Sequence, residues 1–163
     1  MTVMSSRIPA AVDYLVTTIT STLGANAHVF DGPPANGTEL ELNNRVWIGY
    51  SPVSPDLPAV TGDQDFAALG ARSRNENFAI VCAVEYWDGS GAFTVLRAAA
   101  FALLRQIETL LRGTGGNPGD CTLGGAVQFA GLSGGIEVHQ GSTTEGPSVL
   151  LQFHITCRAR LTS

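Results

Sequence analysis

The stretch VLLQFHITCRARL, residues 149–161, decides the fold because its apolar and polar side chains alternate. The odd positions are Val149, Leu151, Phe153, Ile155, Cys157, Ala159 and Leu161, and the even positions after Leu150 are Gln152, His154, Thr156, Arg158 and Arg160. A period of two places the two sets on opposite faces of a β-sheet. We therefore predict a long strand that buries an apolar face and shows a polar, basic face.

Two other segments have the periodicity of amphipathic helices. In residues 8–23 the apolar stripe consists of Ile8, Val12, Leu15, Ile19 and Leu23. In residues 92–112 it consists of Phe93, Leu96, Ala100, Leu103, Ile107 and Leu110. Ser5 or Ser6 can cap the first helix, and Gly24 and Gly113 follow the two stripes, as expected at helix ends.

Shorter apolar runs predict the remaining strands at residues 28–30, 45–50, 77–87, 126–130 and 136–140. The run at 77–87 is apolar on both faces for most of its length, which is typical of a central strand. The run at 136–140 and the final strand form an antiparallel hairpin by their spacing. The chain is thus predicted to be one α+β domain over 1–163, a mostly antiparallel sheet with two helices packed on one face.

Two segments are predicted to lie outside this framework. Residues 1–6 read as a flexible tail, and residues 52–75 read as a long loop because they contain three prolines, two glycines and three aspartates.

Composition limits the possible functions. The net charge is −5 and only 14% of residues are charged, which argues against phosphate binding through clustered cations. The low charge fits either a surface covered by partners or a neutral one rich in Gly and Thr. All nine cations are arginine, and the three cysteines have no framework spacing, which indicates a reducing compartment. The sequence shows no signal peptide and no apolar run long enough for a membrane helix.

Several motifs resemble chemical sites, but each has a structural explanation that we favour. Gly131–Gly135 satisfies Gly-x-Ser-x-Gly, yet a strand follows it where a nucleophile elbow requires a helix, so we expect a Gly-rich turn or bulge. The glycine-rich run 113–119 follows a helix, unlike a phosphate loop. The three histidines lack metal-ligand spacing with the cysteines. We therefore predict no catalytic, cofactor or metal site and no enzymatic activity.

Five segments, in this order, carry a resemblance to a known family: Val29–Pro34, Val46–Tyr50, Arg97–Leu104, Asp120–Gly125 and Phe153–Leu161. Together they resemble the tail terminator-like proteins of long-tailed, siphovirus-type phages and prophages of actinobacteria. The resemblance spans about residues 8–161. The absence of lysine is consistent with a GC-rich host.

The resemblance implies a structural virion protein. Tail terminators are small α+β proteins that form a hexameric ring on the tail tube, stop its polymerisation and join the tail to the head-side connector or stopper. Such a protein would act in the virion tail or neck after assembly in the host cytoplasm, and DNA would pass through its lumen without specific binding. A negative subunit suits this passage, because a basic lumen would retain phosphates.

The acidic segments 31–44 and 52–74 are candidates for the lumen or for contact with a neighbouring ring. Their carboxylates are Asp31, Glu39, Glu41, Asp56, Asp63 and Asp65. Trp47, Arg158 and Arg160 are candidates for an interface, although aromatic residues at such positions are also common in cores. Two alternatives stay open: another head–tail connector, such as a stopper or head-completion protein, and a small-molecule-binding α+β domain.

Overall fold

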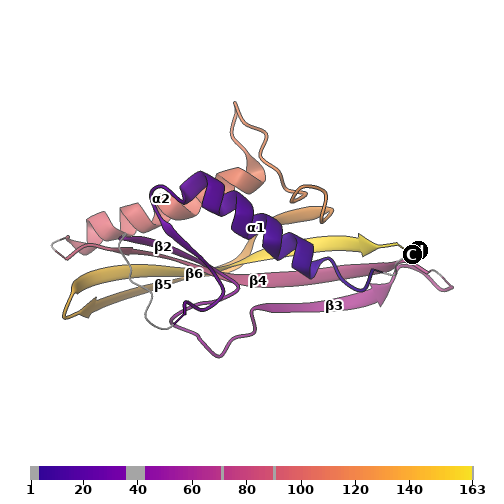
Figure 1. The fold of residues 1–163 in the computed structure, drawn as a ribbon, viewed down its shortest axis with the longest axis horizontal. Helices are drawn as coiled ribbons and strands as arrows, with labels where there is room; N and C mark the ends of the chain where they lie inside the picture. The colour runs from indigo at the N-terminus through magenta and orange to yellow at the C-terminus, as the bar shows by residue number, and fades with distance from the viewer. Residues whose placement is uncertain (1–3, 36–42, 71, 90, 163) are drawn as a thin grey trace.

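A computed structural model describes residues 4–35, 43–70, 72–89 and 91–162. The described residues form two helices, α1 (Ile8–Leu23) and α2 (Phe93–Arg112), and six strands. The strands are β1 (His28–Asp31), β2 (Asn44–Ile48), β3 (Val60–Phe66), β4 (Arg74–Trp87), β5 (Phe129–Thr143) and β6 (Gly146–Leu161). Both helices lie on one side of the sheet (Figure 1), so the predicted α+β fold is confirmed.

The sheet has the order β1-β2-β4-β6-β5, and only the β1–β2 pair is parallel. β4 pairs along its whole length with β6. On its other side β4 pairs with β3 through residues 74–80 and with β2 through residues 82–86. β4 is therefore the central strand, as its two apolar faces predict, and β3 and β5 lie at opposite edges of the sheet.

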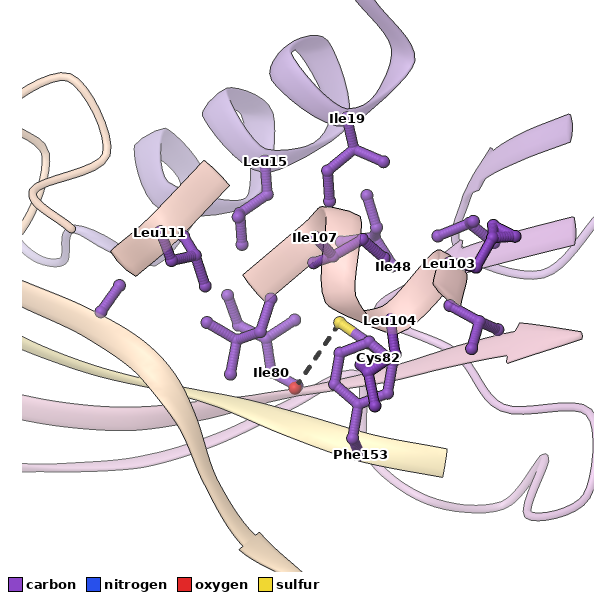
Figure 2. Close-up of a cluster of buried hydrophobic side chains, with 14 of the residues drawn as sticks. Leu15, Ile19, Ile48, Ile80, Cys82, Leu103, Leu104, Ile107, Leu111 and Phe153 are labelled. Carbon is purple, nitrogen blue, oxygen red and sulfur yellow. Dashed lines mark hydrogen bonds between the residues drawn. The ribbon is translucent and has the colours of Figure 1, made fainter. Parts of the chain in front are cut away.

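The main core lies between the helices and the sheet. Leu15 and Ile19 of α1 and Ile107 and Leu111 of α2 point toward the sheet beneath them, where Phe153 lies (Figure 2). The predicted helical stripes are therefore largely confirmed. Leu104 and Leu111 are buried in α2, while Phe93 and Leu110 are only partly buried.

The helix-free face of the sheet carries a second, smaller cluster. It consists of Phe30, Trp47, Ala83 and Leu150, with Tyr50 packed against it. The Phe30 and Trp47 rings stack with centroids 5.7 Å apart.

The N-terminus of α1 is capped by a strand residue. Arg7, the residue before α1, donates its backbone N–H to the Glu76 carboxylate at 2.7 Å, and the Ser6 hydroxyl donates to the same carboxylate at 2.6 Å. Ser6 also accepts the backbone N–H of Ile8 at 3.0 Å. Of the flexible tail predicted over 1–6, residues 1–3 lie outside the described residues, and Ser6 is bound to the sheet through Glu76.

The prediction of a loop over 52–75 is wrong for residues 60–66 and for residues 74–75, which belong to β4. Residues 60–66 form β3, which pairs with β4 from Val60↔Ile80 to Phe66↔Arg74. β3 is an edge strand with exposed side chains at nearly every position, so it needs no apolar alternation. β3 contains one glycine and two aspartates. Because these residue types are depleted in strands, the sequence pattern did not predict a strand here.

Of the two strands predicted at 126–130 and 136–140, residues 126–128 lie in a turn, and residues 129–130 and 136–140 belong to one strand. β5 runs from Phe129 to Thr143, and its register with β6 shifts between Ser133 and Glu137. Gly134 lies in this shift with φ +81°, a conformation that favours glycine. The Gly-rich segment therefore forms a β-bulge, one of the two structures that we predicted for it.

The segment after α2 is held by one carboxylate. Asp120 accepts hydrogen bonds from the Thr122 hydroxyl at 2.6 Å, the Gly124 backbone N–H at 2.7 Å and the Tyr14 hydroxyl of α1 at 2.8 Å. These donors, with Thr122 first, lower the pKa of Asp120 to about 2. The same pairing with Asp120 raises the pKa of Tyr14.

The low pKa of Asp120 predicts an acid-dependent loss of stability. A carboxyl group whose pKa is lower in the folded than in the unfolded chain stabilises the fold above about pH 4, and this contribution disappears as the pH falls toward about 2. In urea titrations between pH 5 and pH 2, the wild-type midpoint should fall more steeply than that of Asp120→Asn. Parallel pH profiles of the two proteins would contradict this assignment.

Candidate functional site

A groove opens on the helical side of the sheet, between α2 and β5. Its volume is about 310 Å³. Phe101, Leu104, Arg105 and Glu108 line it from α2, Leu132, Ser133, Gly134 and Ile136 from β5, and Phe153 and His154 from β6. The groove lies at the bulge of β5, where Gly134 and Gly135 contribute no side chains beyond the backbone.

The rim of this groove is apolar and accessible. Phe101 is 37% exposed and Ile136 is 45% exposed. Phe129 and Val138 of the same edge strand are about half exposed. Because β5 pairs only with β6 among the described strands, its outer edge also presents backbone hydrogen-bonding groups. Exposed apolar side chains beside an open strand edge are typical of a surface that meets another protein.

A second apolar feature lies at the opposite edge of the sheet. We define the hairpin tip as Phe66–Gly70, which begins with the last β3 residue that pairs with β4 and includes the four residues after it. Phe66 is 73% exposed and Leu69 is fully exposed. Together with Ala68 and Gly70 they surround a shallow apolar hollow. The tip projects at the same end of the molecule as Leu161 (Figure 1).

The predicted acidic residues that the structure describes come from three different parts of the fold. Asp63 and Asp65 lie on β3, exposed, and alternate with Gly62 and Gln64. Asp31 is exposed at the end of β1, and Asp56 is exposed in the turns before β3. Glu39 and Glu41 lie outside the described residues. Four of the six acidic residues are therefore accessible to a partner or to a lumen.

The predicted interface residues differ in accessibility. Trp47 is 4% exposed and belongs to the small cluster on the helix-free face, so in the single chain it is a core residue. Arg158 and Arg160 are exposed on that face of β6, and Arg160 donates to the Ser73 hydroxyl at 3.2 Å. Of the three predicted interface residues, the two arginines at the end of β6 are therefore the accessible ones.

The motifs that resemble chemical sites have structural roles here. The Ser133 hydroxyl is hydrogen-bonded to Thr156 across the strand pair, and Ser133 lies in a bulge, not in a strand-to-helix turn. Burial raises the pKa of the Cys82 and Cys157 thiols to about 12, so both remain protonated at neutral pH. Within the described ranges, no group of three or more His, Cys, Asp or Glu side chains could hold a metal ion.

Sequence reasoning did not identify the groove, the hairpin tip or the Glu76 cap. The tip had a local signal, because Phe66 and Leu69 are large apolar residues inside an otherwise polar segment. The groove depends on α2 and β5 meeting beside a bulge, which has no local signature.

No helix in the part of the chain that the structure describes is long and apolar enough to cross a membrane. Comparison with protein-family models and with curated proteins found no match.

Proposed function

We propose that this chain is a ring-forming structural subunit of a phage tail, acting as the tail terminator. The proposal combines the sequence resemblance with one structural observation. Exposed apolar side chains gather at two different places on opposite edges of the sheet, the hairpin tip and the α2–β5 groove. Two different patches on one subunit favour head-to-tail association, which closes into a ring when the rotation between subunits fits.

In this role the ring caps the tail tube, ends its polymerisation and offers its other side to the head-side connector. The subunit acts by assembly and not as an enzyme. The accessible carboxylates Asp31, Asp56 and Asp63 would keep DNA from binding where they face the lumen, because they repel phosphates. The virion tail is the proposed location.

The first test is the oligomeric state of the pure protein. Light scattering after gel filtration and negative-stain electron microscopy should show six-fold rings with a central hole. The second test adds the protein to polymerising tube protein of the phage or prophage that encodes it. We expect shorter tubes with a ring at one end.

These outcomes also separate the alternatives. Rings that leave tube length unchanged but bind the head-side assembly would favour a stopper or head-completion protein. A strict monomer that neither shortens nor binds tubes would contradict the structural role. A small-molecule-binding domain is the second candidate, since the groove volume reaches the lower limit for ligand pockets. The open, half-exposed apolar rim of the groove favours a protein partner instead.

A further inference from the structure

The hairpin tip and the α2–β5 groove are complementary in character. The tip offers two large apolar side chains, Phe66 and Leu69, where the chain turns from β3 to β4. The groove offers an apolar rim of Phe101 and Ile136 above a floor that includes Phe153. Both features are apolar surfaces in contact with water, which is unfavourable in free energy. Burying one against the other would remove this unfavourable contact with water.

The positions of the two features suit contact between copies. β3 and β5 lie at opposite edges of the sheet, so the tip and the groove of one chain lie on opposite sides of the molecule. Phe66 alternates in register with Val60, which packs against the main core, and therefore lies on the helical face, as the groove does. A contact of this kind is head-to-tail and can repeat from one copy to the next.

The charges around the two features are also complementary. Asp65 and Arg72 flank the tip and are both exposed. Arg105 and Glu108 line the groove from α2, and the Glu108 carboxylate contacts Arg112 in a surface ion pair at 2.6 Å. Asp65 and Phe66 are consecutive exposed residues at the end of β3, Phe66 on the helical face and Asp65 on the opposite face. The tip is thus flanked by one acidic and one basic group, and the groove is lined by one basic and one acidic group.

We propose that the hairpin tip of one copy docks in the α2–β5 groove of the next copy. Phe66 and Leu69 pack against Phe101 and Ile136, and Asp65 pairs with Arg105. This inference rests on the proposed function, because it identifies the contact between neighbouring subunits of the ring.

The first experiment removes the apolar contact. Phe66→Ser/Leu69→Ser should fold normally, because both side chains are exposed, and should convert rings into monomers. Each substitution is expected to weaken subunit association about 30-fold, as for an interface hot spot. The matched control is Val53→Ser/Leu57→Ser, which removes two exposed apolar side chains away from the tip and the groove. The control should assemble like the wild type.

The second experiment exchanges the charges. Asp65→Arg and Arg105→Asp should each weaken assembly, and the double variant should restore it, because the pair is re-formed with opposite polarity. Restoration would distinguish a direct contact from general effects of net charge. If the double variant were no better than the single variants, the proposed pairing of Asp65 with Arg105 would be wrong.

The third experiment does not require stable rings. Leu69→Cys/Ile136→Cys, in a chain carrying Cys121→Ser, should give a ladder of disulfide-linked multimers under a mild oxidant. Leu57→Cys/Ile136→Cys is the control. Equal cross-linking of the two pairs, or none at the first pair, would overturn the docking proposal.

The outcomes separate this proposal from the proposed function. Rings that persist in the tip variant would overturn the docking contact and leave the ring function intact. A ladder from a protein that neither forms rings nor caps tubes would support the contact and contradict the terminator role. Tip variants that form rings but no longer bind tubes would show that the tip contacts the tube protein, which also overturns docking between copies.

Discussion

Replacing Glu76 with alanine is expected to destabilise the protein by about 3–4 kcal/mol. The Glu76 side chain is 2% exposed, and its carboxylate accepts hydrogen bonds from the Ser6 hydroxyl, the Arg7 backbone N–H and the Gln64 side-chain amide, all within 2.7 Å. Hydrogen bonds to a charged group contribute about 1.5–3 kcal/mol each, and their loss leaves the half-buried Ser6 hydroxyl and Arg7 backbone N–H without this acceptor. The negative charge also stabilises the N-terminus of α1 through the helix dipole.

The conservative variant Glu76→Gln tests this explanation. Its amide oxygen can still accept, but its NH2 group would face donors, so we expect a smaller loss of about 1–2 kcal/mol. Urea denaturation followed by circular dichroism measures both variants. Glu137→Ala is the control, because Glu137 is an exposed glutamate on β5 and its removal should change stability by less than about 0.5 kcal/mol. A loss for Glu76→Ala as small as the control's would contradict the capping role.

Replacing Phe153 with alanine is expected to destabilise the fold by about 3–5 kcal/mol. Phe153 is fully buried on β6 opposite Cys82, and its ring lies beneath Leu104 of α2 (Figure 2). The substitution removes an aromatic ring from a packed layer between helix and sheet, and the cavity would join the floor of the α2–β5 groove. A loss of this size is a large fraction of the about 5–15 kcal/mol typical of a domain.

Phe153→Leu provides the matched comparison, because it retains most of the apolar volume and should cost less than about 1.5 kcal/mol. Thermal and urea unfolding of the two variants should therefore differ clearly. If Phe153→Ala were as stable as Phe153→Leu, the core would have to collapse fully around the smaller side chain, and the prediction of a cavity at this position would be wrong.

The elements that could be predicted are those whose side chains alternate between core and solvent. The apolar stripe from Leu96 to Ile107 predicts α2, and the alternation from Val149 to Leu161 predicts β6, because each pattern reflects burial of one face. β3 was missed because neither face of an edge strand such as Val60–Phe66 is deeply buried, so its sequence is free to be polar.

The candidate surfaces were harder to predict, for a different reason. The exposure of Phe66 is a local property that its polar neighbours indicate. The groove and the Glu76 cap instead depend on residues far apart in the chain. Glu76 reads as an ordinary strand-end glutamate until Ser6, 70 residues away in sequence, is placed beside it.

The position of β6 has a consequence for how the protein is made. β6 is the sixth strand in sequence, yet it pairs with both β4 and β5 and so joins the two halves of the sheet. A nascent chain cannot complete this sheet until residues 146–161 have left the ribosome, and such long-range pairing is a slow folding step. The groove beside β5 therefore forms only after the hairpin of β3 and β4 has been synthesised.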